Sequence, residues 1–175
     1  HRVAKHFVDP EYKALSNQDA ELAALDQQHP GFARWRTRNT LAHKKPGYVA
    51  VTLSLKPTGV APGDVTDKQW DAIADMADRY SFGQLRTSHE QNIILADVKE
   101  ADLYPLWQKA RAAGFATPNI GLLTDIVCCP GGDFCALANA KSIPIATAIQ
   151  RRFEDLDYLH DIGEVNLNIS GCMNA

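Results

Sequence analysis

The sequence predicts an α+β fold in which helices pack on one face of a small, mostly antiparallel sheet. Three observations lead to this prediction. Residues 47–55 form an apolar, β-branched run typical of a strand. Residues 66–80 carry the start signal and apolar spacing of a helix. Residues 83–98 contain two short strand-like runs around a polar turn, and a second helical segment follows them. The order strand, helix, strand, strand, helix is typical of a layered α+β domain.

The first helix of this unit has a recognisable beginning and end. Proline and glycine make a loop at residues 57–63, and Thr66 to Gln69 then fit a capping box. We expect the helix to end near Tyr80. Four residues share one apolar stripe of the predicted helix: Trp70, Ile73, Ala74 and Ala77.

A hairpin and a second helix complete the unit. Residues 83–87 and 92–98 read as strands, and Ser88-His-Glu90 is the polar turn between them. Residues 100–113 read as a helix, and Gly114 stands where a glycine commonly ends one.

The N-terminal part divides into two kinds of sequence. Residues 10–28 have near-helical leucine spacing. Residues 29–46 are interrupted by proline and glycine and contain basic residues without any acid. Arg34, Arg36 and Arg38 recur with period two, so an extended chain would place all three on one face.

A second unit is predicted to begin near Ala116. It contains a cysteine-rich loop, a helical stretch from about residue 135 to 159 that Pro144 would break, and a last strand over residues 165–170. That strand leads directly into Cys172.

Composition excludes several classes of protein. The chain has 175 residues, 45% of them hydrophobic, and a net charge of −3, so it resembles a globular protein and gives no reason to expect a nucleic-acid partner. No apolar run approaches the roughly 20 residues that cross a bilayer. Three of the four cysteines are clustered and no signal-peptide core is evident, so we expect metal or redox chemistry in a reducing compartment, the cytoplasm. The chain does not begin with Met, and we expect the natural protein to be longer.

The cysteines are the residues most suited to bind a metal or cluster. Cys129 and Cys135 are separated by five residues, and two of these are glycines that let the backbone pass close to a bulky group. We expect Cys135 near a helix N-terminus, where free N–H groups stabilise a thiolate. Cys172 is the only distant cysteine that could join the pair. We interpret Cys128 as a packing residue or as one that contacts the ligands without binding the metal, because adjacent residues rarely bind one metal centre.

The pair alone allows three other interpretations. Free cysteines are often small buried hydrophobic residues. Structural zinc usually has ligands two to four residues apart, and no Cys-x-x-Cys occurs here. Cys129 and Cys135 could also form a redox disulfide.

The C-terminal residues Asn168-Ile-Ser-Gly-Cys-Met-Asn-Ala175, taken with the first pair, resemble the cluster-and-sirohaem signature of the sulfite and nitrite reductase haemoprotein family. That signature is Cys-x5-Cys followed by Cys-x3-Cys. Cys129, Cys135 and Cys172 match its first three cysteines, and Asn174 matches the family asparagine. The fourth cysteine would be residue 176, so the resemblance implies a fragment.

Residues 83–98 are similar to the Arg-x-Thr…Gln-Asn hairpin of the family's ferredoxin-like half-domain. The resemblance divides the chain into an approach segment (1–45), a ferredoxin-like half-domain (46–115) and part of an α/β domain that binds a [4Fe-4S] cluster and sirohaem (116–175). Gln91 and Asn92 are expected to satisfy backbone groups of the turn.

The resemblance also implies roles for individual residues. Cys129, Cys135 and Cys172 would bind the cluster, which passes electrons to sirohaem, and Asn174 and Arg86 would contact sirohaem. Two roles are open for the basic residues at 34, 36, 38, 44 and 45. They could contact sirohaem carboxylates or the missing half of the enzyme, or they could form a solvated face.

The implied partners are sulfite or nitrite, a ferredoxin or flavoprotein electron donor, and the missing N-terminal half. The fragment itself is expected to be inactive. Two alternatives remain open at this point: a ferredoxin-type electron-transfer module without sirohaem, and a structural metal-binding or interaction domain.

Overall fold

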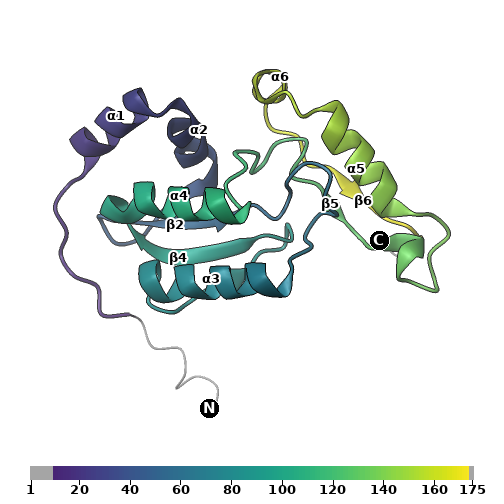
Figure 1. The fold of residues 1–175 in the computed structure, drawn as a ribbon, viewed down its shortest axis with the longest axis horizontal. Helices are drawn as coiled ribbons and strands as arrows, with labels where there is room; N and C mark the ends of the chain where they lie inside the picture. The colour runs from purple at the N-terminus through teal and green to yellow at the C-terminus, as the bar shows by residue number, and fades with distance from the viewer. Residues whose placement is uncertain (1–9, 174–175) are drawn as a thin grey trace, which may run out of the picture.

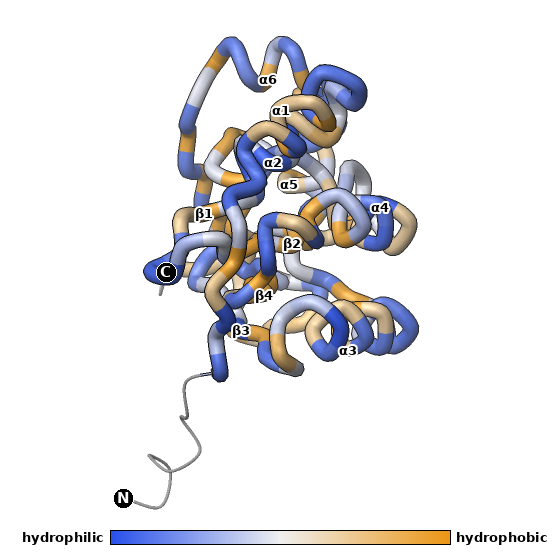
Figure 2. Tube along the Cα trace, turned by 90° about the vertical axis from the view of Figure 1, so that its left-hand side faces the viewer, coloured by the Kyte–Doolittle hydropathy of each residue, from blue (hydrophilic) through white to orange (hydrophobic). Residues whose placement is uncertain are grey.

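The computed structural model describes residues 10–173, and they form an α+β fold, as predicted (Figure 1). A four-stranded antiparallel sheet has the strand order β1-β2-β4-β3. Its strands are β1 (Thr40–Ala42), β2 (Tyr48–Leu53), β3 (Arg86–Thr87) and β4 (Ile93–Lys99). Helices α3 (Asp67–Tyr80) and α4 (Leu103–Ala113) lie together on one side of the sheet (Figure 2). Among the described residues, no helix is long and apolar enough to cross a membrane.

Local signals set the ends of both covering helices. The capping box of α3 is present, because the Thr66 hydroxyl accepts from the Gln69 N–H and the Gln69 side chain accepts from the Thr66 N–H. A short 3-10 helix (Glu100–Asp102) leads into α4, which ends at Gly114 in the left-handed conformation (φ 86°). The buried residues of α3 are Ile73, Met76, Ala77 and Tyr80. Two members of the predicted stripe, Trp70 and Ala74, are exposed.

Residues 19–39 are helical and contribute to the main core. They form α1 (Asp19–Gln28) and α2 (Pro30–Asn39), and Phe32 and Trp35 of α2 are fully buried against α4 and the sheet. The extended conformation that would place Arg34, Arg36 and Arg38 on one face therefore does not occur. Pro30 occupies the first position of α2, where a missing N–H costs nothing, so it starts a helix.

The second unit contains α5 (Ser142–Arg152), α6 (Leu156–Ile162) and a two-stranded parallel pair, β5 (Val127–Cys128) and β6 (Asn168–Ile169) (Figure 1). The expected break at Pro144 does not occur, because this proline lies in the first turn of α5, where it fits. The helices separate instead at residues 153–155, where Asp155 caps α6. Cys135 follows a 3-10 turn (Gly131–Asp133) and precedes α5 by seven residues, so it does not begin a helix.

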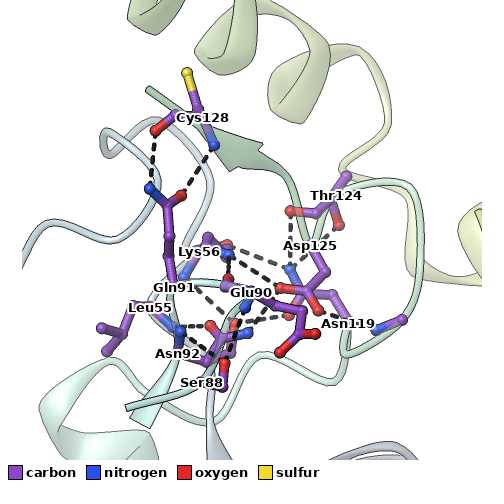
Figure 3. A network of polar contacts seen from close by, with 12 residues as sticks. Leu55, Lys56, Ser88, Glu90, Gln91, Asn92, Asn119, Thr124, Asp125 and Cys128 are labelled. Atoms are coloured by element: carbon purple, nitrogen blue, oxygen red, sulfur yellow. Dashed lines mark hydrogen bonds and ion pairs between the residues drawn. The ribbon is translucent and has the colours of Figure 1, made fainter. Parts of the chain in front are cut away.

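A buried polar network joins the sheet to the second unit (Figure 3). Lys56, which is 1% exposed, donates from Nζ to the Asp125 carboxylate (3.1 Å) and to the Glu90 carbonyl (2.6 Å). The same carboxylate accepts from the Asn92 side chain (2.9 Å) and from the Gly121 N–H (3.1 Å). Burial is the main cause that lowers the pKa of Lys56, and Asp125 opposes that shift. The ammonium is thus held in the interior by specific partners.

Replacing Lys56 with Met should destabilise the chain by about 3–5 kcal/mol, because the Asp125 carboxylate loses its buried cation. Urea unfolding followed by circular dichroism would measure this. Lys68→Met, at an exposed position of α3, is the matched control and should change stability by less than about 0.5 kcal/mol. Equal stabilities of the two variants would contradict a structural role for the pair.

Candidate functional site

The three predicted ligand cysteines line one cavity of about 390 Å³. Cys129 directly follows β5, and Cys172 follows β6 after two intervening residues. Because β5 and β6 run parallel, their ends bring these two residues to the same edge. Cys135 reaches the cavity from the loop that begins at Pro130. All three thiols are free and partly exposed.

Two glycines bring the cysteine loop and the C-terminal segment into close contact. A Cβ added to Gly171 would lie 2.8 Å from the Gly131 Cα and 2.7 Å from the Ala140 carbonyl oxygen. One added to Gly131, which has a φ of +59°, would lie 2.6 Å from the Ser142 hydroxyl. The Gly171 carbonyl also accepts from the N–H groups of Asn139 (2.8 Å) and Ala140 (3.1 Å). Only glycine fits at both positions, so these two residues allow the segments that carry Cys129 and Cys172 to lie in close contact.

The Cys129 sulfur lies among hydrogen-bond donors. The Gly171 N–H donates to it (3.0 Å), and the Ser142 hydroxyl lies 3.4 Å away. These bonds, with Ser142 contributing most and Gly171 next, lower the pKa of Cys129 below its usual value. Burial raises the pKa of neighbouring Cys128, whose side chain packs with Ile126 and Ala146. The two adjacent cysteines therefore differ in chemistry: Cys129 ionises more readily than an ordinary thiol, and Cys128 less readily.

The side chains of Gln91 and Asn92, in the hairpin turn, bond to residues far from that turn in the sequence. Gln91 bonds through both side-chain amide atoms to the backbone N–H and carbonyl of Cys128. Asn92 accepts from the Leu55 N–H (3.0 Å) and donates to Asp125. Sequence analysis assigned both residues to the turn and did not identify these long-range partners, because nothing in the local sequence names a partner 37 residues away. It also missed the role of Ser142.

The remaining predicted site residues lie elsewhere. Arg86 is exposed on β3 and lines a separate cavity of about 1080 Å³ with His43 and Lys44, so it is not brought to the cysteines. Its contact with sirohaem stays a prediction. Asn174 lies outside the described residues.

Three arginines of the basic segment are paired within the chain. Arg34 bonds to Asp157, Arg36 to Asp26, and Arg38 to Glu164 (3.3 Å). The pairs of Arg34 and Arg38 join α2 to the region of α6, so these side chains have internal partners as well as solvent.

The cysteine cavity suits a cluster better than a single ion. Among residues 10–173, no three His, Cys, Asp or Glu side chains approach closely enough to hold one metal ion. A zinc ion needs its ligands within about 2.3 Å of one point. An iron–sulfur cluster spreads its thiolates around a larger core, so cysteines lining a common cavity, backed by glycines and facing N–H groups, fit such a group.

Sulfite and nitrite reductases are among the known proteins that this chain resembles. The model of the nitrite/sulfite reductase ferredoxin-like half domain matches residues 42–113. A sulfite reductase [ferredoxin] of Mycobacterium tuberculosis is 28% identical over 127 residues, which cover 69% of this chain and 23% of that protein. A chloroplastic ferredoxin–nitrite reductase of Betula pendula is 28% identical over 171 residues, covering 93% of this chain and 27% of that protein.

A solved structure shares the fold. The NirA protein of Mycobacterium tuberculosis superposes with a TM-score of 0.56 and 24% identity, over 77% of this chain and 24% of that one. The chain thus spans about a quarter of the length of these relatives.

The lowered pKa of Cys129 predicts selective alkylation. Iodoacetamide reacts with thiolates, so Cys129 should be labelled at lower pH than Cys128, whose raised pKa and burial both slow the reaction. Peptide mass spectrometry across a pH series would measure both rates. Ser142→Ala should move the Cys129 profile to higher pH, and Thr147→Val on the same helix should not. Equal profiles for both cysteines would contradict the assignment.

The glycine contact predicts a second result. Gly171→Ala should cost about 1–3 kcal/mol, because its Cβ forces the two segments apart. Gly132→Ala is the matched control, since its Cβ would meet no atom closer than 3.5 Å. Thermal unfolding compares them, and an equally stable Gly171→Ala variant would refute the constraint.

Proposed function

We propose that this chain, which belongs to the sulfite and nitrite reductase family, supplies three cysteine ligands of an iron–sulfur cluster in a sirohaem-dependent reductase. The ligands are Cys129, Cys135 and Cys172. The enzyme would reduce sulfite to sulfide or nitrite to ammonia. Because the chain spans about a quarter of the length of those relatives, we assign this activity to a whole reductase and not to these 175 residues alone.

One observation carries the proposal: the three cysteines, distant in sequence, line the same cavity. The close contact of Gly131 with Gly171 keeps the two segments that line this cavity side by side. The Gly171 N–H and the Ser142 hydroxyl already face sulfur, and donors of this kind stabilise a coordinating thiolate.

The chain's own residues would bind and orient the cofactors. The cysteines would hold the cluster, and Cys128 would keep solvent from its inner side by packing with Ile126 and Ala146. Arg86 would pair with a carboxylate of sirohaem from the second cavity. When bound, the two cofactors would supply electrons one at a time to the oxyanion.

The partners follow from the same assignment. A ferredoxin or a flavoprotein would donate the electrons, and the N-terminal half of the enzyme would cover the rest of the site. A reducing compartment such as the cytoplasm would keep the thiols available to bind iron.

Anaerobic expression of the full-length protein with sirohaem synthesis intact tests the proposal. Optical and EPR spectra should show a tetrapyrrole band and, after reduction, a cluster signal coupled to it. Serine at 129, 135 or 172 should lower iron and labile sulfide severely. Cys128→Ser is the control and should retain both.

A colourless protein with stoichiometric zinc would refute the proposal in favour of a structural metal site. A cluster without any tetrapyrrole would favour a simple electron-transfer module. Full iron content in a Cys129→Ser protein would show that the ligands are misassigned.

A further inference from the structure

The strand before Cys129 has two hydrogen-bonding edges, and only one of them faces another strand. On that edge, Val127 N–H donates to the Leu167 carbonyl (3.0 Å) and Cys129 N–H to the Ile169 carbonyl (3.1 Å). Backbone groups alternate along a strand, so the N–H and carbonyl of Cys128 point to the opposite edge. No strand covers that edge among the described residues.

The side chain of Gln91 occupies the open edge (Figure 3). Its Oε1 accepts from the Cys128 N–H (2.9 Å) and its Nε2 donates to the Cys128 carbonyl (3.0 Å). A primary amide has the same donor and acceptor as a peptide group, so it can replace the missing neighbour strand. The strand β5 is thereby hydrogen-bonded along both of its edges.

Gln91 is itself rigidly placed. Its backbone is in the left-handed region (φ 57°), which a non-glycine residue adopts only when its surroundings enforce it. The Ser88 hydroxyl accepts from the N–H groups of Glu90 and Asn92 (both 3.2 Å) and so fixes the turn. Asn92 then anchors this turn to the buried carboxylate of Asp125. The backbone of Gln91, from which its side-chain amide extends, is therefore held in place within the ferredoxin-like half.

We propose that Gln91 is a positioning residue for Cys129: its amide clamps the preceding peptide and so sets where the Cys129 sulfur lies relative to the Gly171 N–H. Ile169 holds the Cys129 N–H and Gly171 holds the sulfur. Without the Gln91 clamp, β5 keeps only the bonds to β6 and can rotate about that edge. The clamp thus transmits the geometry of the hairpin to the cysteine cavity.

Gln91→Met tests the proposal, because methionine fills similar space but cannot form either bond. In the 175-residue chain, amide exchange at Cys128 should become about tenfold faster, and the Gly171 amide resonance should move as the sulfur shifts. Exchange in β2 and β4 should stay as in the wild type. Gln84→Met is the matched control, since the Gln84 side chain lines the other cavity.

A wild-type Cys128 exchange rate and Gly171 resonance in Gln91→Met would overturn the proposal. So would an equal acceleration at all amides, since that would mean only lower overall stability. If Gln91→Met does not fold, Gln91→Glu keeps the acceptor and loses the donor. It should then protect the Cys128 N–H while still shifting Gly171, and an unchanged Gly171 resonance would overturn the proposal.

The inference rests on the proposed role of Cys129 as a cluster ligand, but the exchange experiment needs no cluster. A confirmed clamp in a protein that never binds iron would therefore reject the proposed function and keep the positioning role.

Discussion

The buried ion pair of Lys56 and Asp125 is the interaction on which the arrangement of the two units depends. Lys56 follows β2 of the antiparallel sheet, and Asp125 precedes β5, so their bond spans the junction between the units. A buried ammonium is tolerated only with well-placed partners, and here a carboxylate and a carbonyl provide them. Because Asn92 shares the same carboxylate, the hairpin turn is tied to the same point. Hydrogen bonds and ion pairs depend on direction, so this junction specifies how the two units are oriented. Apolar packing alone would specify that orientation less well.

The cysteine cavity inherits its geometry from that junction through two further constraints. The side chain of Gln91, next to Asn92, bonds to the backbone N–H and carbonyl of Cys128. The close contact of Gly131 with Gly171 then fixes the C-terminal segment against the loop. These constraints act mainly on backbone groups, so they preorganise the chain around the cavity. Preorganisation lowers the conformational entropy lost when a cofactor is bound.

Sequence analysis succeeded where one short segment determines the outcome. The capping box at Thr66 and the terminal glycine at Gly114 are local devices, and both appear as predicted. It failed where tertiary packing decides. The arginines of α2 alternate as a strand would, yet Phe32 and Trp35 have helical spacing and bury their rings against the core. Pro144 was predicted to break a helix, but its effect depends on its position within the helix, which the sequence did not define.

The candidate site divides in the same way. The cysteine pair, taken with the family resemblance of the C-terminal segment, predicted that Cys129, Cys135 and Cys172 lie together, and a parallel strand pair joins the distant segment to the loop. The residues that set the environment of the sulfur are ordinary: a serine, a glycine and a glutamine. Their types are common in any loop, so only their partners distinguish them, and those partners are 13, 42 and 37 residues away. The cysteines can therefore be identified from the sequence. The geometry around them depends on contacts between distant residues, which the sequence does not show.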